Sequence, residues 1–253
     1  MNQLGDRKVY FEFTGGEVTF HPEIDQILKF IKSRDGLTGI ISNGSRTLSW
    51  WEERLDLFDH VCLSFHPERG EQEHFARVVS LLNQNSSVHV NIMMTPENFD
   101  DLNSFGRRVL KDNPGISLSL QPLFEKFTGP IYGYSDEQKR ILEKPDLPYV
   151  RNPKEFVVRG SMKATDESGK SEIVDPTLLI SRGENQWKGW NCAAGLENIV
   201  ITMSGHVMRG VCSAGGVIGT ITDPEFRLPT EPVTCPFEHC HCAFDVMSSK
   251  TKV

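Results

Sequence analysis

The first 145 residues alternate short runs rich in β-branched and aromatic side chains with longer runs whose apolar residues recur at helical spacing. Strands are expected at 9–13, 37–41, 61–65, 88–93 and 116–120. Helices are expected at 22–31, 50–58, 75–82 and 102–110, and Ser135 opens a further capped helix. Parallel neighbours need a crossover connection, so strands that each precede a helix indicate parallel βα units. The pattern predicts an α/β fold, a partial or full (β/α) TIM-like barrel.

The loops that follow the expected strands are the predicted place for chemistry, because barrel enzymes build their sites at the carboxyl ends of the strands. These loops hold polar and small residues at 15–17, 42–45, 64–67 and 93–96. His21 and His66 could face the same region, although lone histidines near prolines are more often ordinary loop residues.

From about Pro145 the pattern changes, and we expect a linker near 145–155. The stretch 156–190 has weak periodicity that fits strands or hairpins. Beyond Trp190 the chain is β-like, with two strands around a turn over 198–212. We therefore predict a partial barrel at 1–150, a connector at 151–189 and a small cysteine-rich β-hairpin domain at 190–253.

Composition narrows the class of protein. The chain has 253 residues, 38% of them hydrophobic and 24% charged, which is enough for a full core. A formal charge of −7 gives no basic excess for neutralising phosphates and argues against nucleic-acid binding. The first residues lack the apolar core of a signal peptide, and no run of apolar residues approaches the length of a membrane span. We expect a cytoplasmic protein without a membrane partner.

Five of the six cysteines lie in the last quarter of the sequence: Cys192, Cys212, Cys235, Cys240 and Cys242. In a reducing compartment, clustered cysteines are more often metal ligands than disulfides. Four thiolates can hold a [4Fe–4S] cluster or a tetrahedral Zn²⁺, and the number of ligands does not separate the two. The Cys240-His-Cys242 spacing is tighter than a zinc knuckle, and at least one thiol could be spare. A purely structural metal site is the alternative.

The sixth cysteine, Cys62, stands between Val61 and Leu63 in an expected strand. A buried, unreactive thiol is the expectation there, because free cysteine often behaves as a small apolar residue.

Two motifs resemble a known family. The run Phe13-Thr14-Gly15-Gly16-Glu17 at a strand end resembles the Gly-Gly-Glu motif of radical S-adenosylmethionine (SAM) enzymes. The C-terminal cysteines resemble an auxiliary iron–sulfur domain of the SPASM or twitch type. The resemblance implies that Gly15, Gly16 and Glu17 receive the ammonium group of SAM. Ser64 would contact its ribose or carboxylate, or else cap the next turn. Val18 stands where the family usually has proline.

The family's CxxxCxxC motif is absent, since no cysteine precedes Cys62. A strand, cysteine loop and helix need roughly 30 residues, so we expect the first βα unit to be missing. The reading frame could be truncated, an upstream polypeptide could supply the loop, or the chain could be a degenerate homologue. The edge of the first strand would then be unpaired.

If the missing cluster loop is supplied, the resemblance implies an enzyme that takes electrons from a donor and abstracts hydrogen from a peptide or small metabolite. The isolated chain is not expected to cleave SAM. A non-catalytic interaction module that binds zinc or an iron–sulfur cluster is the competing interpretation.

Overall fold

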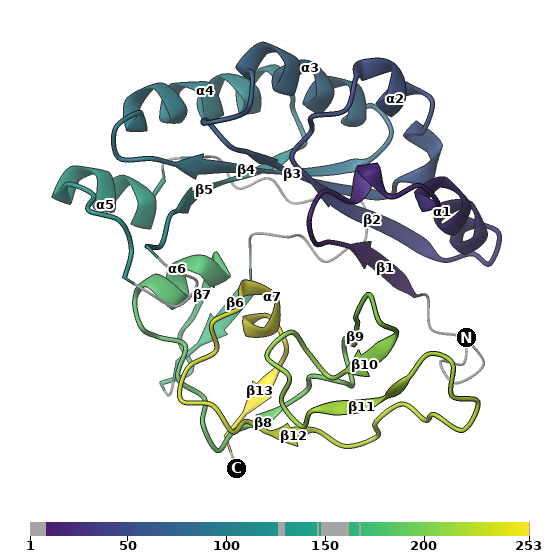
Figure 1. The fold of residues 1–253 in the computed structure, drawn as a ribbon. Coiled ribbons are helices and arrows are strands. Elements are labelled where there is room, and N and C mark those ends of the chain that lie inside the picture. Colours follow the sequence, from purple (N-terminus) through teal and green to yellow (C-terminus); the bar gives the residue numbers. More distant parts are fainter. Residues whose placement is uncertain (1–8, 126–129, 146, 148–161, 167, 253) are drawn as a thin grey trace. The chain divides into compact units, whose positions relative to one another are not determined.

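The computed structural model describes residues 9–125, 130–145, 147, 162–166 and 168–252. The described chain divides into two compact units, one built from residues 9–125, 131–145 and 147, the other from Pro130 and the residues beyond 161. The linker expected at 145–155 lies largely outside the described residues. Figure 1 traces the elements of both units.

The N-terminal unit is built on a five-stranded parallel sheet in the sequential order β1-β2-β3-β4-β5. This order confirms the α/β prediction, since each strand pairs with the next one along the chain, as in a partial β/α barrel. The strands are β1 (Tyr10–Phe13), β2 (Leu37–Ser42), β3 (His60–Phe65), β4 (Ser87–Met94) and β5 (Ser117–Pro122).

Helices connect the strands, and Figure 1 shows α1 to α4 along one face of the sheet. The helices are α1 (Ile24–Lys32), α2 (Leu48–Glu52), α3 (Gln72–Leu82), α4 (Phe99–Asp112) and α5 (Asp136–Glu143), with short 3-10 turns η1 (Val18–Phe20) and η2 (Leu55–Leu57). The helix expected at 50–58 is therefore shorter and is followed by a separate turn. Its start is set by Thr47, whose hydroxyl accepts a hydrogen bond from the amide of Trp50. The capped helix at Ser135 is confirmed, with both bonds of a capping box.

The sheet has two chemically different faces, because successive side chains of a strand point to opposite sides. One face packs against the helices in a continuous apolar core that includes Val61, Leu63 and Phe65 of β3. The alternate positions are polar or sulfur-bearing: His60, Cys62 and Ser64 in β3, and His89 and Asn91 in β4. Cys62 is fully buried, as expected.

The C-terminal unit contains short antiparallel sheets. The first is a two-stranded hairpin, and the others have the orders β11-β10-β9 and β12-β8-β13. Their strands are β6 (Met162–Thr165), β7 (Ser171–Val174), β8 (Asn191–Cys192), β9 (Val200–Ile201), β10 (His206–Met208), β11 (Val217–Thr220), β12 (Val233–Thr234) and β13 (Lys250–Thr251). The turn expected within 198–212 joins β9 to β10. Two short helices complete the unit, α6 (Pro176–Ser181) and α7 (Ala243–Val246).

Within the described ranges, no helix combines the length and apolar character that a membrane crossing requires.

Candidate functional site

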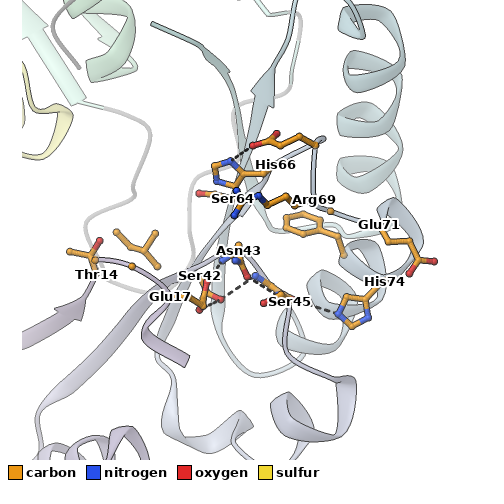
Figure 2. Close-up of a pocket in the computed structure, with 17 residues that line it drawn as sticks. Thr14, Glu17, Ser42, Asn43, Ser45, Ser64, His66, Arg69, Glu71 and His74 are labelled. Carbon is orange, nitrogen blue, oxygen red and sulfur yellow. Dashed lines mark hydrogen bonds and ion pairs between the residues drawn. The ribbon is translucent and has the colours of Figure 1, made fainter. Parts of the chain in front are cut away.

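A pocket of about 690 Å³ lies at the carboxyl ends of β1, β2 and β3 (Figure 2). Three of the four predicted loops line it, at 14–17, at 41–45 and at Ser64 and His66, together with residues 68–71, 74 and 75. The fourth loop, at 93–96, and His21 are not among the lining residues. Carboxyl ends of neighbouring parallel strands meet at one edge of a sheet, which explains why segments far apart in sequence converge here.

Gly15 and Gly16 form the β1 side of this pocket. Their φ angles are 103° and 54°, in the region that residues with a side chain seldom adopt. A Cβ atom built on either glycine would have no neighbour within 4 Å. Neither glycine is therefore needed for packing inside the chain. The open space leaves the backbone accessible to a ligand.

Glu17 faces its own protein. Its Oε1 accepts hydrogen bonds from the backbone amide and hydroxyl of Thr19, at 3.3 and 2.7 Å, and from the Ser42 hydroxyl at 2.8 Å. Its Oε2 accepts the amide of Asn43 at 2.8 Å. The sequence resemblance assigns this carboxylate to a ligand's ammonium group. In the structure it caps η1 and links the loop after β1 to the loop after β2, and Figure 2 shows it beside Ser42 and Asn43.

The loop after β2 is held from two further sides. The His74 Nε2 lies 3.1 Å from the carbonyl of Gly44 and 3.0 Å from that of Arg46. Carbonyl oxygens only accept hydrogen bonds, so this nitrogen carries the proton. The Arg46 guanidinium donates to the Thr19 carbonyl and stacks 3.9 Å from the Phe20 ring centre. These contacts fix the rim of the pocket before a ligand binds.

Ser64, His66 and Arg69 lie together at the β3 side of the pocket, away from Thr14 and Glu17 (Figure 2). The carboxylate of Glu68 lies 3.7 Å from the His66 Nδ1. Arg69 forms no ion pair with another described residue, and it is exposed. No sequence motif pointed to this arginine. The pocket thus has accessible glycine backbone on one side and hydroxyl and guanidinium donors on the other.

All five predicted cysteines lie in the C-terminal unit. Cys192 lies in the central strand β8, opposite Val233 and Lys250. The backbone of Cys235 exchanges hydrogen bonds with Gly189 and Trp190. Cys192, Cys235 and Cys240 are buried, Cys212 and Cys242 are half-buried, and none forms a disulfide.

Four of these thiols influence one another electrostatically. The pKa of Cys212 is raised to about 11, mainly by burial, with smaller contributions in the same direction from Asp245 and Cys192. Burial also raises the pKa of Cys240 to about 12, with Asp245, Cys212 and Cys235 adding to the rise and Lys250 opposing it. Cys212 therefore interacts electrostatically with Cys192, and Cys240 with Cys212 and Cys235. Metal binding at such thiols must displace their protons.

Two buried side chains organise this cysteine neighbourhood. Asp245, 1% exposed, accepts the amides of Val211 at 3.0 Å and Cys212 at 2.5 Å. Asn185, 2% exposed, exchanges backbone hydrogen bonds of 2.9 Å with Cys240 through its own carbonyl and its side-chain amide. These contacts fix the backbone on which two of the thiols are carried.

In the part of the chain that the structure describes, no three His, Cys, Asp or Glu side chains are arranged as ligands around one metal ion. The assignment of the five cysteines as ligands therefore stays a prediction.

Comparison with known proteins gives likenesses to solved structures but no match by sequence. No protein-family model matches the chain, and no curated protein matches its sequence. The chain resembles the crystal structure of archaeal TYW1 with a TM-score of 0.38 and 12% sequence identity, over 66% of this chain and 56% of that one. The chain thus spans little more than half the length of archaeal TYW1.

Proposed function

We propose that the pocket at the ends of β1, β2 and β3 binds SAM, and that the chain belongs to a radical SAM-type iron–sulfur protein. The observation that carries the proposal is the place of the Thr14-Gly15-Gly16-Glu17 motif. It follows a parallel strand and borders a pocket of about 690 Å³. Pockets of this size suit a nucleotide-sized ligand.

The two sides of the pocket suit the two ends of an amino-acid group. An ammonium group needs hydrogen-bond acceptors, which the accessible backbone at Gly15 and Gly16 can supply. A carboxylate needs donors, and the Ser64 hydroxyl and Arg69 guanidinium line the opposite side. SAM carries both groups on its methionine portion. The residues present therefore fit this cofactor.

Glu17 has a positioning role in this proposal. Its carboxylate is bonded to Thr19, Ser42 and Asn43. It holds the loops after β1 and β2 together and so keeps the glycine backbone in place. If SAM bound here were cleaved reductively at an iron–sulfur cluster, it would supply a radical able to abstract hydrogen from a substrate. A peptide or small metabolite is the substrate class that the sequence resemblance favours.

The C-terminal cysteines are the proposed site of an auxiliary [4Fe–4S] cluster. Cys192, Cys212, Cys235, Cys240 and Cys242 together supply the four thiolates that such a cluster takes, with one to spare. Zinc takes the same number, so a zinc-binding interaction module is the second candidate function. The same observation favours both, and metal analysis separates them.

SAM binding to the purified chain tests the pocket. Isothermal titration should show one saturable site, and Arg69→Met should weaken it by about 10- to 100-fold, because a charged hydrogen bond is lost. Arg77→Met is the matched control, since Arg77 is exposed on α3 and does not line the pocket. Equal affinity in all three proteins would place SAM elsewhere. Absence of saturable binding would refute the proposal.

Iron, sulfide and zinc per chain after anaerobic purification and reconstitution test the cysteine site. About four irons with matching sulfide are expected for one auxiliary cluster. Stoichiometric zinc without sulfide would replace this part of the proposal with the interaction module.

A further inference from the structure

A chain of hydrogen bonds crosses the polar face of the sheet and ends at Ser64. In β4, the His89 Nδ1 lies 2.8 Å from the Ser117 hydroxyl, and its Nε2 lies 3.0 Å from the Asn91 Oδ1. The Asn91 Nδ2 in turn lies 3.4 Å from the Ser64 hydroxyl and 3.3 Å from the Cys62 sulfur. The register of the strands makes this possible, because Asn91 pairs with Ser64 and His89 with Ser117.

The direction of each bond follows from which atoms can donate. The Asn91 Oδ1 only accepts, so the His89 Nε2 must carry a proton and donate it. A neutral His89 then has a bare Nδ1, which accepts the Ser117 hydroxyl hydrogen. With its oxygen engaged by His89, Asn91 presents its amide hydrogens to Cys62 and Ser64. The Ser64 oxygen is therefore an acceptor on its inner side.

The hydroxyl hydrogen of Ser64 is left for the pocket. Ser64 lines the pocket, and the bond from Asn91 is its one side-chain hydrogen bond within the described residues. A serine hydroxyl has one hydrogen to donate. We propose that Asn91, oriented by His89, is a positioning residue that makes Ser64 a hydrogen-bond donor to an acceptor oxygen of the ligand.

This inference rests on the proposed function and makes it more specific. It assigns an oxygen that accepts hydrogen bonds, such as a carboxylate or ribose oxygen, to the β3 side of the pocket beside Arg69.

The change Asn91→Asp tests the direction of the bond with almost no change in shape. A carboxylate accepts from both His89 and Ser64, so the Ser64 hydrogen turns inward and only its lone pairs face the pocket. The probe is S-adenosylhomocysteine, which keeps the amino-acid and nucleoside groups of SAM without the sulfonium charge. Its affinity, measured by isothermal titration, should fall by about tenfold. Asn98→Asp, at an exposed residue outside the pocket, is the matched control and should bind as the unchanged protein does.

A double-mutant cycle separates this role from effects of charge or folding. Asn91→Asp acts through Ser64, so the same change made in a Ser64→Ala background should lose most of its effect. An equal loss of affinity in both backgrounds would overturn the inference and leave the proposed function standing. Unchanged affinity in the single variant, with the melting temperature retained, would also overturn it. If the unchanged protein binds neither SAM nor S-adenosylhomocysteine, the proposed function fails and the inference falls with it.

Discussion

Replacing Glu17 should loosen the rim of the pocket and lower the stability of the N-terminal unit. Its carboxylate accepts four hydrogen bonds from Thr19, Ser42 and Asn43, and Thr19 is 1% exposed. Hydrogen bonds to a charged group each contribute about 1.5–3 kcal/mol, and a helix cap about 1 kcal/mol. The four bonds share one half-buried group, so their contributions do not add. We expect Glu17→Ala to cost about 3 kcal/mol, or roughly 6–12 °C in melting temperature for a unit of this size.

Glu17→Gln should fall between the unchanged protein and Glu17→Ala. The glutamine oxygen can replace the Oε1 that receives Thr19 and Ser42, while its NH₂ group faces the amide of Asn43, another donor. The loss should be about half as large.

The measurements are thermal unfolding and hydrogen exchange at the amides of Asn43 and Gly44. The Gly44 amide bonds to the Ser42 hydroxyl, which itself donates to Glu17, so both amides should exchange faster in the alanine variant. Glu23→Gln, at an exposed residue, is the control and should stay within about 0.5 kcal/mol of the unchanged protein. An alanine variant with unchanged melting and exchange would refute this account of Glu17.

Three further changes test other contacts. Arg54 forms two 2.8 Å hydrogen bonds to Asp25 and lowers the pKa of that carboxyl group. This pair therefore adds to the free energy of unfolding above about pH 4, and its contribution is lost as the pH falls through the lowered pKa. The stability difference between the unchanged protein and Asp25→Asn should therefore vanish in acid, and a constant difference in urea titrations down to pH 2 would contradict this. Asp245→Asn should cost the C-terminal unit about 2–3 kcal/mol, because the new NH₂ group meets a backbone donor, and an unchanged urea midpoint would disprove it. Cys235→Ala should lower both metal content and the melting temperature of that unit, whereas full metal content with unchanged melting would remove it from the ligands.

The sequence was sufficient for the N-terminal unit because its signals are local. The apolar run at 61–65 located β3 to within one residue, and its Val61, Leu63 and Phe65 pack in the apolar core. The sequence predicted four strand-end loops as the place for chemistry, from Gly15, Gly16 and the strand-end polar residues. Three of these four loops line the pocket.

Other features depended on contacts between segments. Strand order and register decide which loops line the pocket, and no local sequence pattern reveals them. The same holds for the hydrogen bond between Glu17 and Ser42 and for the one between Asn91 and Ser64. Arg69 lies in a loop without a motif. The helix α6 did have a local signal, Asp175 as N-cap followed by Pro176 at the first helical position, inside a stretch of weak periodicity.

The most direct test of the account is a crystal structure of the chain with SAM. The account predicts electron density for one molecule in the pocket at the ends of β1, β2 and β3, with its ammonium group at the Gly15 and Gly16 backbone and its carboxylate or ribose oxygen at Ser64. SAM bound at another place, or an empty pocket at a saturating concentration of the ligand, would contradict it.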